Sequence, residues 1–163
     1  MIELSTHHNF AHLLATGAVC RGWARSASGN TAEGIRWIEQ GIRDGRATGA
    51  VLGLAPDLAC KAQALHLADR TPEALEAISE AVAIAERFEH GYHSAEMHRL
   101  RGVFLATLGA EESQIEASFC EAIRIAKEQK SISLKKRAEA TFAEYYRQKG
   151  SPSGGRGVRL PLW

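Results

Sequence analysis

The sequence has few of the residues that build disulfide frameworks, and it lacks any long apolar run. Its 163 residues include three cysteines, Cys20, Cys60 and Cys120, with no CxxC pair. An odd, widely spaced set of this kind is typical of a reducing compartment. No run of 18 apolar residues is present, and no charged and then apolar leader follows Met1, which argues against a membrane span and a signal peptide. We therefore expect a cytoplasmic protein with no membrane partner.

The chain also lacks a net charge of either sign. Lys and Arg number 20 against 19 Asp and Glu, a net charge of +1, so no global attraction to nucleic acid or membrane is expected. The charge is nevertheless uneven, because residues 124–163 carry ten basic against three acidic side chains, and residues 1–123 carry ten against sixteen. The hydrophobic fraction of 45% is ordinary for a soluble globular domain.

What the sequence does contain is a repeat of 40–41 residues. Mostly small side chains occupy the matching positions, where they let two helices pack closely. The matching sets are Gly22, Ala62 and Gly102; Gly34, Ala74 and Ile115; Gly41, Ala81 and Ala122; and the turn positions Gly29, Asp69, Gly109 and Gly150. Self-similarity at a fixed period predicts stacked helix hairpins.

Apolar spacings of three and four residues predict seven helices. The clearest hairpin lies in residues 56–89, where Thr71 is a good N-cap and Pro72 fits the first helical position. The predicted helices lie near residues 6–28, 31–46, 51–68, 72–89, 92–108, 113–129 and 132–149. We expect one all-α repeat domain over 1–150 and an irregular tail over 151–163. The apolar end of that tail, Leu160-Pro161-Leu162-Trp163, suggests that it folds back over the seventh helix, which has no hairpin partner.

The hairpins resemble tetratricopeptide repeats, although those conventionally repeat every 34 residues. The resemblance rests on CRGWARSASGNTAEGIRWIEQGI, RTPEALEAISEAVAIAER, and AEMHRLRGVFLATLG followed by IEASFCEAIRIAKEQ. The longer period resembles the helical arrays at the C-terminus of bacterial STAND-type signalling ATPases and adenylate cyclase-like regulators. It implies an α-solenoid of about three tetratricopeptide-like helix hairpins plus a terminal helix. The sequence has no GxxxxGK[ST] motif and no room for a cyclase domain, so neither activity is carried over.

In such superhelical arrays the first helix of each pair lines the concave face, which is the usual peptide-binding surface. Repeat register predicts a groove lined by Trp23, Gln63, His66, Glu96, Arg99, Glu144 and Arg147. Trp and Arg are enriched at binding hot spots, which makes Trp23 a candidate anchor. Burial of Trp23 against the N-terminal helix is the alternative.

Two histidine groups have spacings that could bind metal. His8 and His12 lie four residues apart beside His7, but no further ligand is indicated. The second group is Glu89, His90, His93, Glu96 and His98. It lacks HExxH, and His98 falls on a different helix face from His93. We expect the first group to be a solvated N-terminal turn and the second to be a pH-sensitive surface. No cofactor is expected at either.

The cysteines occupy positions where the repeat favours small buried side chains, so we expect them in the core. A basic run consists of Lys127, Lys130, Lys135, Lys136 and Arg137, joined later by Arg147, Lys149, Arg156 and Arg159. Nucleic-acid binding would use such a stripe with Tyr145 and Tyr146 as stacking platforms. A solvated helical junction and a basic tail explain the same residues.

These observations favour a non-catalytic module that binds a protein or peptide, as the regulatory or scaffolding part of a bacterial signalling system. No group of residues combines a nucleophile, a base and an oxyanion donor, so we do not expect an enzyme. The apolar side of the unpaired seventh helix also predicts a homodimer through the C-terminal end. A nucleic-acid-binding regulator and a His-rich metal protein are the alternatives.

Overall fold

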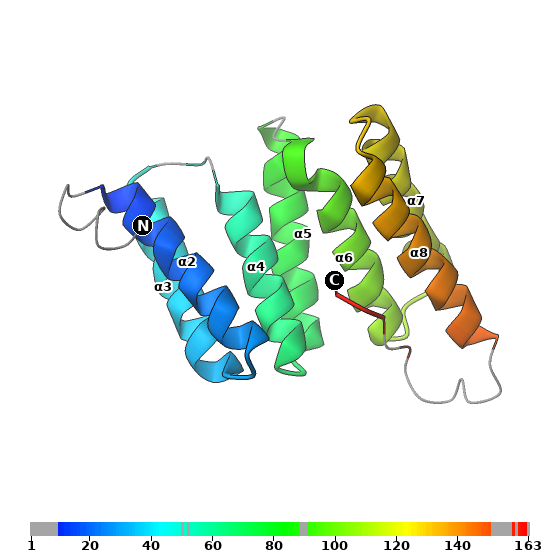
Figure 1. Cartoon of the computed structure of the whole chain (residues 1–163), viewed down its shortest axis with the longest axis horizontal. Coiled ribbons are helices and arrows are strands. Elements are labelled where there is room, and N and C mark those ends of the chain that lie inside the picture. The colour runs from blue at the N-terminus through cyan, green and yellow to red at the C-terminus, as the bar shows by residue number, and fades with distance from the viewer. Residues whose placement is uncertain are drawn as a thin grey trace. The chain divides into compact units, whose positions relative to one another are not determined.

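The computed structural model describes residues 10–49, 51, 53–88, 91–150, 158 and 160–162. These residues form an all-α fold of seven α-helices, packed as sequential antiparallel pairs (Figure 1). The α-helices are α2 (Ala11–Ala27), α3 (Thr31–Ala47), α4 (Leu54–Leu67), α5 (Thr71–Arg87), α6 (Ser94–Thr107), α7 (Glu112–Glu128) and α8 (Ile132–Lys149), with a 3-10 helix, η1 (Gly91–His93), before α6. The predicted all-α fold class is confirmed. Residues 6–9 of the first predicted helix lie outside the described part.

The chain divides into two compact units, Met1–Ile84 and Ala85–Trp163. In the first unit α2 pairs with α3, and α4 contacts both of them. In the second unit α6 pairs with α7, and α8 contacts both. Each unit therefore contains a close helix hairpin with a third helix packed against it, and the first unit also holds most of α5. The single repeat domain over 1–150 stays a prediction.

Glycine lets α2 and α3 approach each other backbone to backbone. A Cβ atom on Gly22 would lie only 2.5 Å from the carbonyl oxygen of Gly34, and one on Gly41 would lie 2.6 Å from that of Ala15. In the second unit, a Cβ atom on Gly102 would instead meet the ring of Phe119 at 2.9 Å. These small positions are therefore the points where paired helices touch.

Three of the predicted turn positions share one backbone geometry, which Lys130 between α7 and α8 also adopts, with φ 54°. Gly29, Asp69 and Gly109 have φ values of 95°, 59° and 67°, in the left-handed region that favours glycine and tolerates aspartate. After each of them, the next backbone N–H donates to the carbonyl five residues earlier, at 2.9–3.0 Å. This hydrogen bond satisfies a carbonyl at the end of the preceding helix. Gly150, the fourth predicted turn position, has φ −76° and ends α8 without this geometry.

The tail returns to the second unit. Leu160 and Leu162 are both only 6% exposed, and Figure 1 shows this short segment beside α6. The sequence predicted a return over α8, whereas the hydrogen bonds of the segment are to Arg99 of α6. The aromatic side of α8 packs on α7, where the rings of Phe119 and Phe142 stack at 5.1 Å.

Candidate functional site

Arg99 is the most deeply buried charged side chain of the described structure, with 1% exposure. It projects from α6 one turn after Glu96, so the two side chains meet on one face of the helix. Arg99 Nε donates to Glu96 Oε2 at 2.9 Å, and Arg99 Nη2 donates to Glu96 Oε1 at 2.8 Å. This bidentate pairing neutralises the guanidinium and fixes its plane, which is what a buried arginine needs.

The remaining donors of Arg99 face α8 and the tail. Nη1 donates to Thr141 Oγ1 at 3.2 Å and to the carbonyl oxygen of Pro161 at 3.2 Å. Nη2 donates to the carbonyl oxygen of Leu162 at 2.5 Å. With the two bonds to Glu96, this makes five hydrogen bonds, which matches the five N–H donors of a guanidinium. The tail carbonyls therefore complete the coordination of a charge that cannot reach water.

Arg137 of α8 connects the rim of this arrangement to its centre. Its Nη1 donates to Glu96 Oε1 at 3.4 Å, and its side chain is 49% exposed. Its backbone carbonyl accepts the hydroxyl of Thr141 at 2.9 Å, which leaves the Thr141 oxygen oriented to accept from Arg99. We call Glu96, Arg99, Arg137 and Thr141 the Arg99 site.

The hydrogen bonds from the Arg99 site to the tail both end on main-chain oxygens. The site holds two consecutive carbonyl oxygens, at Pro161 and Leu162. Leu160 and Leu162 are buried while Pro161 between them is exposed. Alternation of this kind is the period-two pattern of an extended strand. The arrangement can therefore bind an extended segment by its backbone and by every second side chain.

The seven predicted groove residues divide between the two units. In the first unit, Trp23, Gln63 and His66 are each half-buried. Gln63 donates to the carbonyl of Ala59 on its own helix, and His66 pairs with Thr71 while burial lowers its pKa. Each polar side chain thus has a partner near it in sequence.

In the second unit the structure forms two pairs from the predicted groove residues. Glu96 meets Arg99, and Glu144 meets Arg147 at 2.6 Å. The Glu144–Arg147 pair is solvent-facing, and hydrogen bonds from Arg147 and Gln148 lower the pKa of Glu144 to about 2. Arg99 itself is not open to solvent, because Glu96, Thr141 and the tail carbonyls enclose it.

Sequence reasoning missed Arg137 and Thr141 as site residues. Nothing in their neighbourhood distinguishes them, because Arg137 belongs to a basic run and Thr141 to an ordinary helical face. For Leu160 and Leu162 there was a signal, namely the apolar end of an otherwise Gly-rich tail. That signal indicated burial without identifying the helix that receives the segment.

The described members of the two histidine groups do not come together. His7, His8, Glu89 and His90 lie outside the described residues. His98 is buried, which lowers its pKa, and Glu121 and Glu86 partly oppose that shift. The ring of His93 packs edge-on against Tyr92, and Glu96 is turned towards Arg99. Within the described part of the chain, no three His, Cys, Asp or Glu side chains are placed to hold a metal ion.

His12 of α2 lies near the start of α4. Its Nδ1 atom is buried without a hydrogen-bond partner among the described residues. Burial raises the pKa of Asp57 to about 6, against the charge of His12. Burial of the Cys60 thiol itself, together with the charges of Asp57 and Cys20, raises the pKa of that thiol to about 12. The thiol of Cys60 therefore stays protonated at neutral pH and is a poor nucleophile.

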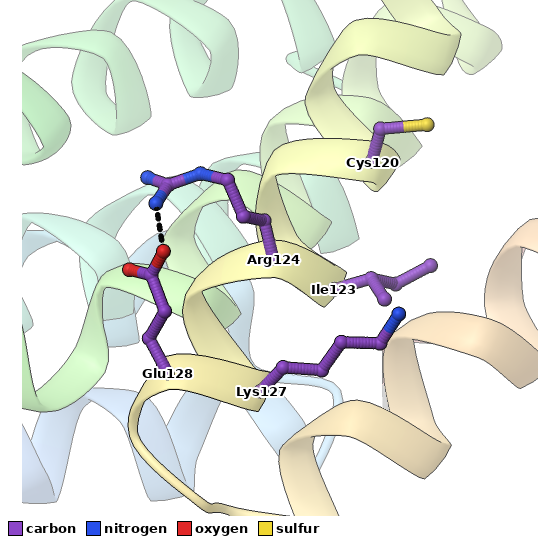
Figure 2. A pocket seen from close by; sticks show the side chains of 5 residues that line it. All are labelled: Cys120, Ile123, Arg124, Lys127 and Glu128. Carbon is purple, nitrogen blue, oxygen red and sulfur yellow. Dashed lines mark hydrogen bonds and ion pairs between the residues drawn. The ribbon is translucent and has the colours of Figure 1, made fainter.

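The expectation that all three cysteines lie in the core is wrong. Cys20 and Cys120 are exposed and Cys60 is half-buried. The inner positions belong to neighbouring residues such as Val19 and Phe119, so a cysteine one residue further on faces outwards on a helix. Figure 2 shows Cys120 at one end of a pocket. The side chains that line this pocket all project from α7, and Arg124 among them donates a hydrogen bond to Glu128.

Four of the seven described residues of the basic run pair with carboxylates. Its ion pairs include Lys135 with Glu139, Arg137 with Glu96, Arg147 with Glu144 and Lys149 with Glu112. Tyr145 is buried, and Tyr146 donates to Glu116. A carboxylate beside each of these cations weakens the field that a phosphate backbone requires. Arg156 and Arg159 lie outside the described residues.

Comparison with known proteins gives no family and no activity. No family model matches the chain, and neither does any solved structure. An uncharacterized protein of Rhizobium meliloti (strain 1021) is 29% identical over 144 residues. That match covers 88% of this chain but only 14% of the relative's length. Among the helices of the described residues, none is long and apolar enough to cross a membrane.

Proposed function

We propose that this chain is a non-catalytic module that binds an extended segment of a protein or peptide at the Arg99 site. The observation that carries the proposal is the seating of residues 160–162, whose two carbonyls bond to Arg99 and whose two leucines are buried. Main-chain hydrogen bonds give affinity to such sites, and alternate side chains give specificity. By repeat register α6 and α8 are first helices of their pairs, and first helices are the ones expected to line the binding face of a tetratricopeptide-like array.

The resemblance to STAND-type and adenylate cyclase-like regulators supports a sensing or assembly role for this module. In the Rhizobium meliloti protein, the similar segment is a small fraction of a much longer chain. We propose that the module reports the presence of a peptide or protein ligand to such a signalling system. The pairing of the basic side chains with carboxylates disfavours nucleic acid as the ligand.

Site-specific photocrosslinking tests this proposal in the full chain. A photoreactive residue replaces Arg137 on the rim of the Arg99 site, or Arg124 on α7, where the side chains are 49% and 54% exposed. The first position is expected to crosslink a protein in cells of the source organism and the second is not. The same protein, once purified, should then bind the unmodified chain at one-to-one stoichiometry in calorimetry.

Equal crosslinking from both positions, or none from position 137, would contradict a ligand at the Arg99 site.

Homodimerisation through the α8 end remains a separate proposal. Ile132 at the start of α8 is 70% exposed and supplies apolar surface for it. A monomer at micromolar concentration in light scattering would refute the dimer without affecting the crosslinking result.

A further inference from the structure

We infer that residues 160–162 are a resident competitor in the Arg99 site, and that the ligand is an extended segment with apolar side chains two residues apart. The ligand then binds by displacing the chain's own tail. This inference rests on the proposed function, because it specifies the ligand and the regulation of the same site. It follows from three features of the contacts around Arg99.

The first feature is the backbone nature of the contacts. Both hydrogen bonds from Arg99 to the tail end on carbonyl oxygens, and every residue type supplies a carbonyl. The residue between the two buried leucines is proline, which has no N–H to donate, and it is exposed. The site therefore places no demand on the middle side chain. Selectivity comes from the two flanking positions, where large apolar side chains are buried.

The second feature is the dependence of Arg99 on an occupant. Glu96 and Thr141 accept three of its five hydrogen bonds, and the tail carbonyls accept the other two. Without the segment, a guanidinium at the centre of the site would lose these partners until water or another segment replaced them. A buried charged donor without an acceptor is costly. The open site is therefore disposed to take a second extended segment with the same carbonyl spacing.

The third feature is the tether. Residues 160–162 belong to the same chain as α8, which ends at Lys149, so the segment stays close to the site after it dissociates. A short tether gives an effective concentration of about 1 mM. If the tail segment itself binds the open site with a Kd of about 10–100 μM, its competition weakens the apparent affinity of a free ligand by roughly 10- to 100-fold. The tail therefore sets a threshold that only an abundant or better-fitting ligand passes.

Fluorescence anisotropy with a labelled peptide tests the inference in the full chain. The probe is VRLPLW, the sequence of residues 158–163, and its control is VRSPSW. The chain variants are Leu160→Ser with Leu162→Ser, which removes both buried side chains of the tail, and the matched pair Leu13→Ser with Val51→Ser, which changes two exposed apolar side chains of the first unit. The double variant is expected to bind VRLPLW at least tenfold more tightly than wild type. The Leu13→Ser with Val51→Ser variant should resemble wild type, and VRSPSW should bind none of the proteins.

Circular dichroism confirms that the double variant keeps its helices before binding is interpreted. Equal affinity of wild type and the double variant for VRLPLW would show that the tail is not a competitor. A folded double variant that ignores VRLPLW, or binds VRSPSW equally well, would show that the site does not select such segments. These outcomes overturn the inference while leaving the crosslinking test of the proposed function independent, because crosslinking requires neither the probe peptide nor a tail variant.

A second substitution connects binding to the guanidinium. In the double variant, Arg99→Lys keeps the positive charge but removes the fork that reaches two carbonyls. We expect it to weaken VRLPLW binding at least tenfold, whereas the matched change Arg147→Lys, at an exposed ion pair of the same unit, leaves binding unchanged. Equal binding by both lysine variants would remove Arg99 from the recognition mechanism.

Discussion

Gly34 in α3 offers the sharpest test of how the first hairpin is packed. Its substitution by alanine adds a Cβ atom 2.5 Å from the carbonyl oxygen of Gly22 and 2.8 Å from the backbone nitrogen of Ser26. Both atoms belong to the α2 backbone and cannot rotate away, so the helices themselves must move apart. Gly45 is the matched control, because it lies in the same helix and its added Cβ would be 3.7 Å from the Cβ of Ala15, an ordinary contact.

The two substitutions are expected to change stability in opposite directions. Both gain about 0.5–1 kcal/mol from alanine's higher helix propensity. Overpacking of Gly34→Ala costs about 1–3 kcal/mol in general, and the upper end applies here because the obstructing atoms are backbone. The free energy of unfolding should therefore fall by about 2 kcal/mol for Gly34→Ala, and rise by up to about 1 kcal/mol for Gly45→Ala.

Urea unfolding followed by tryptophan fluorescence measures this difference. In a Trp163→Phe background, the remaining tryptophans are Trp23 in α2 and Trp37 in α3, so the signal reports the first unit. With a urea m-value of about 1 kcal/mol/M for a unit of this size, the midpoint should fall by about 2 M for Gly34→Ala. A Gly34→Ala variant as stable as wild type would refute backbone contact between α2 and α3.

Two further predictions concern titration and thiol chemistry. Burial raises the pKa of Asp57 to about 6. The stability that its neutral carboxyl contributes is therefore complete below the unfolded-state pKa and is lost as pH rises through about 6. Asp57→Asn should raise the free energy of unfolding by roughly 1–2 kcal/mol at pH 7, after allowance for solvent screening, and should change it little at about pH 3.5. Thermal denaturation at the two pH values checks this, and an equal effect at both would contradict a raised pKa. Exposed Cys20 and Cys120 should react with a maleimide much faster than Cys60, because burial raises the pKa of the Cys60 thiol to about 12. Mass spectrometry should show two rapid additions and a slow third. Three equal rates would contradict the burial of Cys60.

The fold was predictable because its determinants are local and repeated. The turn at Asp69 combines Thr71 and Pro72 at the start of α5 with a residue type that accepts positive φ, and all three features are visible in sequence. The contact between Gly22 and Gly34 was predictable for the same reason, since a small residue recurs at one period on both helices. Such signals depend on neighbours within a few turns of helix.

The Arg99 site was predictable only in part, because its completion depends on distant residues. Glu96 and Arg99 both lie on α6 and pair with each other, whereas their place in a concave groove stays a prediction. The burial of Arg99, however, depends on carbonyls 62 and 63 residues further along the chain, and carbonyls carry no sequence signal. The cysteines were misplaced for a simpler reason, since one residue of helix rotates a side chain by about 100° and moves Cys20 and Cys120 from the inner to the outer face.

The two kinds of helix contact have a consequence for how such repeats diverge. Ile38 occupies the position in α3 that Phe119 occupies in α7, and each side chain faces a glycine on its paired helix, Gly22 or Gly102. The first hairpin is spaced by touching backbones and the second by an aromatic ring. Repeats that differ in this way are not interchangeable, because a helix moved from one hairpin to the other would meet a partner that packs at a different interhelical distance. Changes on paired helices must then be inherited together, so each hairpin, and not each helix, is the unit of recombination.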